Sequence, residues 1–483
     1  MFDSQEPPKT FLQKLQERAA ASRFFTVSVF LHVILIFMGG TVVLFKRMSE
    51  PPDFSSSDGL VSSEVNAAPP PEEKMEVQEQ MVAPTPTLSA PSLSAITTSA
   101  AAPTFTVAQA VAVVKVAQTD AMSEALKHVS PPKGLAGNAS GAFGRRGGQA
   151  RAAAIMEKGG KKESEEAVLK GLKWLVEHQN PDGSWGGAYQ GAMTGFAMLT
   201  FLGHNELPNS PDYGPTVEKG LNWLLENGKK NDGRMNMAGA FDQPGVYAHA
   251  IATYALGEYY GMTKDERAAD LFKKAIGYIV AGQGPDGGWM YAYDKSKSDT
   301  SVSGWQIQAL KAAHLSGLNM DGVDGALDKA MLNLKRVQAE DGSFGYRDAK
   351  PGNYSLTGAG VLCTYFWKQE KDKSVKEGIE YLIKETEKGH PLDYHHETAD
   401  LYAWYYNTQA CLMVGGGAWT KWNSRFQEQL YKNQNPDGSW PPLAGKSPGG
   451  PLQRDPEGDG PVYRTCLCVL MLEVFYRYSP TLR

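Results

Sequence analysis

The residues most capable of acid–base or metal chemistry lie in the C-terminal half of the chain. Asp299 begins the segment Asp-Thr-Ser, and His396 precedes Asp400 by four residues. Carboxylates and imidazoles transfer protons and bind metal ions, and a four-residue spacing would place His396 and Asp400 on one helix face. We therefore take Asp299, His396 and Asp400 as candidate catalytic residues. Asp299 could equally do no more than stabilise a helix start, and the other two could be polar residues on a solvated rim.

Other side chains could line a ligand cavity near these three. The candidates are polar or aromatic residues in or just before apolar segments: Asp242, His249, Trp305, Glu397, Tyr405 and Arg464. Tyr405 lies in an aromatic-rich run at 402–406, whose rings could stabilise a carbocation. The same spacing is typical of residues that simply fill a helical core, so both interpretations stay open.

Charge and cysteine usage exclude some classes of function. The net charge of −5 gives no electrostatic footprint for nucleic acid. The four cysteines lie inside apolar runs, without the paired spacing typical of a zinc site, so we expect buried free thiols. We expect neither a bound metal nor a cofactor.

A repeated phrase describes the scaffold that must position these side chains. Copies of Gln-x-x-Asp-Gly-x-Trp or a close variant occur at 179–185, 231–235, 283–289, 338–344 and 434–440. A fixed period of roughly 50 residues indicates stacked supersecondary units. The last gap is nearly two periods long, which predicts a sixth, degenerate copy near 387–390. The expected structural anchors are Gln179, Asp182, Trp185, Gln283, Asp286, Trp289, Gln338, Asp341, Phe344, Gln434, Asp437 and Trp440.

The segments around each copy predict pairs of helices. An amphipathic helix precedes each Asp-Gly, as in TVEKGLNWLLENG, where Val217, Leu221 and Leu224 form one apolar stripe. A nearly uniformly apolar helix follows, which predicts burial on all sides. Six such pairs would place six buried helices inside six outer ones. The predicted fold class is therefore all-α, an α/α toroid of six helix-pair repeats over residues 161–483.

The phrase resembles the repeat of the squalene cyclase and protein prenyltransferase superfamily, over about residues 165–480. Its residue types suit a structural joint, because Asp-Gly favours a tight turn and the aromatic ring can anchor that turn in the core. The resemblance implies a ligand cavity framed by the inner helices.

Two family motifs are incomplete in this sequence. The resemblance implies an Asp-x-Asp-Asp-Thr motif, through which squalene cyclases protonate an alkene. Residues 296–300 of this chain read Ser-Lys-Ser-Asp-Thr instead, with Ser298 at the proton-donating position. Zinc in the prenyltransferases is bound through Asp-x-Cys and a His, and the matching positions hold Ser301 and Arg464. An arginine is not a zinc ligand. We therefore expect both chemistries to be lost.

The N-terminal third differs in character from the repeats. Residues 24–45 form an uncharged apolar run long enough to span a bilayer, preceded by more basic residues than follow it. This pattern predicts a cytoplasmic tail at 1–23, one transmembrane helix at 24–45, a Pro/Ala/Ser/Gly-rich linker at 46–160 and an extracytoplasmic (periplasmic) toroid. Ser28 and His32 share one helix face, and the segment resembles the anchor of TonB-type energy transducers. That resemblance implies a membrane motor complex as partner, while the plainer interpretation is a tolerated histidine.

These observations together predict a single-pass membrane protein whose toroid is a non-catalytic binding or scaffold module. Its ligand would be an unidentified lipid, glycan or protein. The alternative is a cyclase-like enzyme acting on an isoprenoid, or a glycan-acting lyase, through the toroid cavity.

Overall fold

The computed structural model describes residues 143–236, 243–367, 371–445 and 450–478. These residues are helical, with no β-strand beyond an isolated bridge between Gln338 and Phe344. No helix among them is long and apolar enough to cross a membrane. The predicted anchor, with Ser28 and His32, lies outside the described residues.

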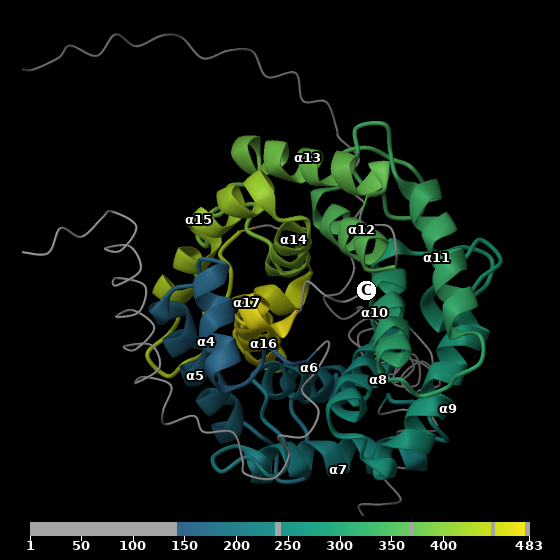
Figure 1. Cartoon of the computed structure of the whole chain (residues 1–483), viewed down its shortest axis with the longest axis vertical. Coiled ribbons are helices and arrows are strands. Elements are labelled where there is room, and N and C mark those ends of the chain that lie inside the picture. Colours follow the sequence, from purple (N-terminus) through teal and green to yellow (C-terminus); the bar gives the residue numbers. More distant parts are fainter. Residues whose placement is uncertain (1–142, 237–242, 368–370, 446–449, 479–483) are drawn as a thin grey trace, which may run out of the picture.

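The described helices form two concentric rings (Figure 1). The outer ring contains α5 (Lys162–Glu177), α7 (Gly214–Lys230), α9 (Glu266–Gly282), α11 (Val323–Val337), α13 (Lys373–Lys388) and α15 (Gly416–Lys432). The inner ring contains α6 (Gln190–Gly203), α8 (Gln243–Thr263), α10 (Thr300–Leu315), α12 (Tyr354–Phe366), α14 (Leu401–Val414) and α16 (Gly460–Leu472). Each inner helix packs on the next, and α16 packs on α6, so the ring is closed. The predicted α/α toroid of six helix pairs is confirmed.

We call the turn between the outer and the inner helix of a repeat, with its repeated phrase, a joint. The side-chain amide of the repeated glutamine links the joint to the neighbouring repeat. Gln179 Nε2 donates to Gly183 O (2.9 Å) in its own turn and to Thr216 O (3.0 Å) in α7. Gln283 and Gln338 donate in the same two directions, to α11 and α13. Gln434 donates to Gly438 O and to Ala167 O in α5, both at 2.9 Å. The last joint is therefore fastened to the first repeat.

The aspartate and the aromatic residue of the phrase hold the turn itself. Asp182 Oδ1 accepts from the backbone N–H (3.0 Å) and the hydroxyl (2.6 Å) of Ser184. The Trp185 side chain is fully buried, and its indole N–H donates to Leu175 O at 2.7 Å. Trp289 and Trp440 donate equivalently to Ile279 O and Leu430 O. The ring thus lies under its own outer helix and fixes the angle between the two helices.

The sixth joint lies where the repeat spacing predicted it, between α13 and α14, but it contains no Asp-Gly turn. α13 ends at Lys388, and a loop over 389–400 leads into α14. The His390 ring stacks on Tyr354 at 4.2 Å between centroids, and the buried Tyr394 donates its hydroxyl to Pro441 O at 2.7 Å. Aromatic stacking therefore replaces the repeated phrase here.

The folded body begins earlier than the predicted boundary at residue 161. Helix α4 (Gly148–Glu157) packs on α17 (Val474–Arg477), the short helix that follows α16. Arg146 Nη1 donates to Leu202 O at 3.0 Å, and Arg151 Nη1 donates to His204 O at 3.0 Å. The Gly and Arg content of residues 143–160 predicts a linker. Buried partners for the two arginines attach this segment to the toroid instead.

Each turn glycine lies close to the next outer helix, and substituting it tests whether this close packing stabilises the joint. Gly287 (φ 89°) and Gly317 (φ 71°) both have left-handed backbones, but a Cβ on Gly287 would collide with Lys329 O, whereas one on Gly317 would meet nothing within 4 Å. Gly317→Ala should cost about 1–2 kcal/mol of unfolding free energy from backbone strain alone. Gly287→Ala should cost a further ~1–3 kcal/mol from the collision. Urea unfolding of the full chain measures both, and equal losses would contradict this account of the joint.

Candidate functional site

Hydrogen bonds bring the first turns of the inner helices together at one end of the toroid. Ser301 Oγ in α10 contacts Tyr402 OH in α14 at 2.8 Å. Ser355 Oγ in α12 donates to Asp400 Oδ2 at 2.7 Å. Three buried aspartates begin α10, α14 and α16: Asp299, Asp400 and Asp459. We call this the acidic end of the ring.

Asp299 lies at the centre of a cluster of tyrosines at the acidic end. Its side chain is fully buried, and Oδ1 accepts from Ser301 N (2.8 Å) and Val302 N (3.1 Å) as the N-cap of α10. The surrounding phenols come from α8, from the loops after two joint aromatics, and from α14. We call this group the Asp299–tyrosine cluster: Asp299, Tyr247, Tyr291, Tyr346 and Tyr402.

Burial dominates the electrostatics of this cluster. Loss of solvent raises the pKa of Asp299, and the α10 backbone N–H groups with the nearby Tyr346 and Tyr291 hydroxyls only partly offset that effect. Burial, reinforced by the Asp299 charge, raises the pKa of Tyr291 to about 12. The Tyr291 and Tyr346 hydroxyls contact each other at 2.5 Å. The arrangement can hold a proton on or beside a carboxyl group in a desolvated site.

The backbone that carries Tyr291 is strained. Ala292 and Tyr293 have φ values of 55° and 51°, a left-handed conformation that side chains other than glycine rarely adopt. Tyr293 is held there by packing on Gly282 and by donating its hydroxyl to Gln306 Oε1 at 3.2 Å. Backbone strain of about 1–3 kcal/mol per residue persists only where the surroundings enforce it, and such sites are often functional.

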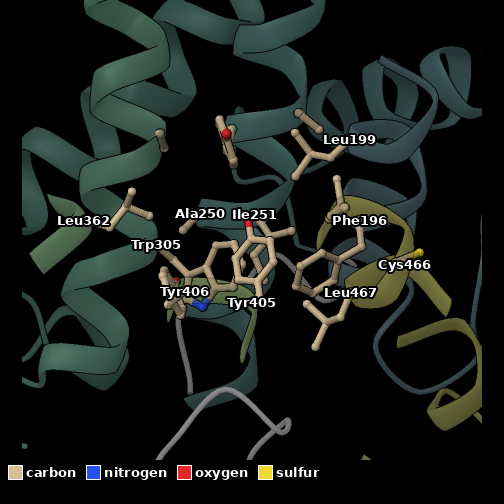
Figure 2. Close-up of a cluster of buried hydrophobic side chains, with 14 of the residues drawn as sticks. Phe196, Leu199, Ala250, Ile251, Trp305, Leu362, Tyr405, Tyr406, Cys466 and Leu467 are labelled. Atoms are coloured by element: carbon tan, nitrogen blue, oxygen red, sulfur yellow. The ribbon is translucent and has the colours of Figure 1, made fainter. Parts of the chain in front are cut away.

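Aromatic rings fill the interior of the toroid beyond the acidic end. Figure 2 shows Phe196, Trp305, Tyr405 and Tyr406 converging from three inner helices. The Trp305 ring stacks on Tyr405 with centroids 5.7 Å apart, and Phe196 meets Trp305 edge-on at 5.2 Å. All four side chains are buried completely. Trp305 and Tyr405, predicted to line a cavity, therefore pack against each other on the inside of the ring.

His396 and Asp400 do not share a helix face, because residues 391–400 form a loop that ends where α14 begins. The Asp400 carboxylate accepts from two backbone N–H groups of α14, from Gln453 Nε2 (3.0 Å) and from Ser355 Oγ. His396 Nδ1 contacts Thr398 Oγ1 at 2.9 Å instead. The i,i+4 pair that the sequence suggested is replaced by a helix cap, and Glu397 is exposed beside it. The described residues contain no group of three His, Cys, Asp or Glu side chains placed to hold a metal ion.

Two other candidates belong to the joints. His249 Nδ1 accepts from Met235 N (2.9 Å), and its Nε2 contacts Ala275 O at 3.0 Å. Burial lowers the pKa of His249 to about 4, which keeps the imidazole neutral for these roles. Arg464 donates to the carbonyl oxygens of Trp440, Leu452 and Asp455. Both side chains connect a turn to an inner helix, as Thr194 does for Trp185 N in the first repeat. Asp242 lies outside the described residues.

Sequence reasoning found Asp299 but not the tyrosines around it. Tyr291 and Tyr346 each lie two residues after a joint aromatic, in Trp-Met-Tyr and Phe-Gly-Tyr. The repeat register could have identified these two tyrosines, because equivalent loop positions of successive repeats lie at the same end of a closed ring.

Fold and cluster together define a closed α/α toroid with one acidic end. The squalene-hopene cyclase C-terminal domain model matches residues 147–293. Over these residues, and in its repeated joints, the chain is similar to the squalene cyclase and prenyltransferase repeat superfamily.

Solved structures with a similar arrangement include two enzymes. One is the GH76A α-1,6-mannanase from Salegentibacter sp. HEL1_6, at 12% identity and TM-score 0.47, covering 64% of this chain and 98% of that one. Another is the type II terpene cyclase MstE from Scytonema, at 15% identity and TM-score 0.45, covering 65% of this chain and 98% of that one. No curated protein sequence matches the chain.

Replacing Asp299 tests its electrostatic environment. Asn is an equally good N-cap, so Asp299→Asn should keep α10 capped while removing the buried charge. The folded pKa of Asp299 lies above its ordinary 3.8, so the folded state binds more protons than the unfolded state between these values. The wild type should therefore lose stability relative to Asp299→Asn as pH rises through the folded pKa, by up to ~1.4 kcal/mol per pH unit.

Urea unfolding of the full chain from pH 4 to 8 checks this sign. The exposed Asp348→Asn is the matched control and should show no comparable divergence. A difference between wild type and Asp299→Asn that is constant with pH would rule out the buried charge.

Proposed function

We propose that the chain is a membrane-anchored protein whose extracytoplasmic toroid works as a binding or scaffold module. The observation that carries this proposal is the aromatic packing inside the ring, where the side chains of Phe196, Trp305, Tyr405 and Tyr406 are buried against one another. A scaffold needs a rigid closed ring, whereas an enzyme of this fold needs an internal cavity.

The residues at the family's catalytic positions support the same proposal. Ser298 Oγ donates to Asp286 Oδ2 (2.5 Å) and accepts from Asn333 Nδ2 (2.8 Å), so it braces a joint. Ser301 and Arg464, at the positions of zinc ligands, are engaged by Tyr402 and by backbone carbonyls. Each replaced residue thus has a structural role.

A second candidate function rests on the Asp299–tyrosine cluster. A buried carboxyl with a raised pKa beside phenols is a feature of acid–base sites. Tyr291 and Tyr346 are the half-buried members of the cluster, so an isoprenoid or glycan would reach it through these two phenols. In this alternative the toroid is an enzyme that uses Asp299 as its acid.

One assay separates the two candidates. The purified full chain should not turn over a prenyl diphosphate or a neutral oligosaccharide, and Asp299→Asn should behave as the wild type does. Lipid and glycan extraction from the same preparation should recover any ligand that the module carries. Turnover abolished in Asp299→Asn but retained in Asp348→Asn would overturn the binding proposal and establish the enzyme.

We further propose that the anchor docks to a membrane motor complex through Ser28 and His32. The two residues lie four apart, and an ionisable side chain in mid-membrane is costly unless it has a partner. His32→Ala should abolish cross-linking of the motor partner in native membranes while leaving membrane insertion unchanged. Thr26→Ala, on another face of the expected helix, should cross-link like the wild type. Undiminished cross-linking of His32→Ala would contradict this role.

A further inference from the structure

The outer helices α13 and α15 meet at the sixth joint without a contact that the other joints make. In each of the five joints that contain an Asp-Gly turn, the turn glycine lies against one residue of the next outer helix. A Cβ added to that glycine would lie within 3.0 Å of the helix residue. In chain order, the residues contacted in this way are Lys170, Lys219, Lys274, Lys329 and Glu377. We call this position of an outer helix the turn-contact position.

The repeat spacing identifies the turn-contact position of α15. Lys170 precedes Gln179, the glutamine of its own repeat, by nine residues. Arg425 in α15 precedes Gln434 by the same nine residues. No glycine among the described residues approaches Arg425, because α13 continues to Lys388 and the loop after it has no Asp-Gly turn. The groove between α13 and α15 is therefore not covered by a joint turn.

A pocket opens in this groove. It has about 90 Å³ of open space, which is below the ~300–1,000 Å³ of a small-molecule site and suits a few side chains of a peptide. The buried side chains of Trp422 and Leu392 form its apolar wall. Lys421, Arg425 and Glu387 are exposed and form its rim.

The rim carries more positive than negative charge. Lys421 Nζ lies 2.8 Å from Glu387 Oε1, in an exposed ion pair that contributes little stability and can exchange partners. The Lys421 hydrogen bond and charge, with a smaller effect of Arg425, lower the pKa of Glu387. Among the described residues, no carboxylate forms an ion pair with Arg425. Two cations thus face one carboxylate, which favours the approach of a second carboxylate.

The covered grooves show that a turn carboxylate suits such a rim. Asp286 Oδ2 accepts from Arg336 Nη2 of the next outer helix at 3.2 Å. Asp232 forms an ion pair with Lys274 in the same way. A turn aspartate therefore pairs with a cation of the neighbouring outer helix in two of the five phrase-containing joints.

The pocket also presents a backbone carbonyl that matches the acceptor of the joint glutamines. Gln179 Nε2 donates to Thr216 O at 3.0 Å, and Thr216 lies three residues before the turn-contact position Lys219. The same spacing before Arg425 identifies Trp422, which lines the pocket. No side chain among the described residues donates to Trp422 O. An amide donor could bind there as glutamine does in the other repeats.

The aromatic residue of the phrase has no equivalent position in this groove. The Trp185 ring lies beside Gly220, one residue after a turn-contact position, and a Cβ there would collide with it. The corresponding residue of α15 is the buried Phe426, whose ring packs on Trp419 and Phe475. An incoming turn would therefore use its polar residues and its glycine but no aromatic ring.

We propose that the groove between α13 and α15 binds an acidic, glycine-containing turn of a partner protein. Its carboxylate would pair with Arg425 and Lys421, and an amide group would donate to Trp422 O. A second copy of the chain does not fit, because its own turns already contact its own outer helices. This inference names a partner class for the binding module proposed above and rests on that function.

Fluorescence anisotropy of a labelled turn peptide tests the proposal with the full chain. The probe is Gln-Asn-Pro-Asp-Gly-Ser, which copies residues 434–439 and omits the tryptophan. We expect saturable binding that weakens by roughly fivefold or more when Asn replaces the Asp or Val replaces the Gly of the probe. No saturable binding, or equal binding of the altered peptides, would overturn the proposal. Turnover dependent on Asp299 would instead remove the proposed binding function, so the two failures are distinguishable.

Variants of exposed residues locate the binding. Arg425→Glu reverses one rim charge and should weaken the affinity for the probe about tenfold or more. Lys173→Glu makes the same charge change on an exposed part of α5 and should bind the probe like the wild type. Ser424→Trp places a large ring at the pocket mouth and should abolish binding. Wild-type affinity in either pocket variant would contradict the assigned site.

Discussion

The double hydrogen bond from each joint glutamine is the interaction on which the closed ring depends. One amide group serves two carbonyls, one in its own turn and one in the adjacent outer helix, so forming a turn also sets the position of the next repeat. In an open stack the terminal repeats would leave such groups unused. Here Gln434 reaches Ala167, and Asp459 accepts from Tyr189 N at 2.8 Å, so the last repeat provides the partners of the first.

Closing six inner helices into one ring creates an electrostatic constraint at both ends. The first turns of α10 and α14 each direct free N–H groups at a buried aspartate, Asp299 or Asp400, which matches the positive ends of their dipoles. The opposite end carries Lys311, Arg146 and Arg477 near the last turns. These charged side chains compensate the partial charges at the helix termini. At each end of the ring, however, one charged side chain has contacts beyond this role. At the acidic end it is the carboxyl of Asp299, which is surrounded by phenols. At the opposite end the buried Arg477 guanidinium lies near the buried Glu473 carboxylate, and both retain polar atoms without a hydrogen-bond partner among the described residues.

Aromatic side chains pack against one another inside the ring. In this ring large aromatic side chains converge from α6, α10 and α14 and pack on one another. Their burial stabilises the closed ring.

The sequence alone determined the helix pairs, their number and the joint residues. The reason is that the repeated phrase and the apolar periodicity are local properties, and both recur in each repeat. It also identified Asp299 as a helix-starting carboxyl. Only the tertiary structure decided that His396 and Asp400 lie on a loop, that Arg146 and Arg151 belong to the folded body, and that Trp305 packs on Tyr405. Those outcomes depend on contacts between residues tens to hundreds of positions apart, such as Arg146 with Arg477. Ring closure brings such residues together, and local sequence patterns do not predict which of them will be in contact.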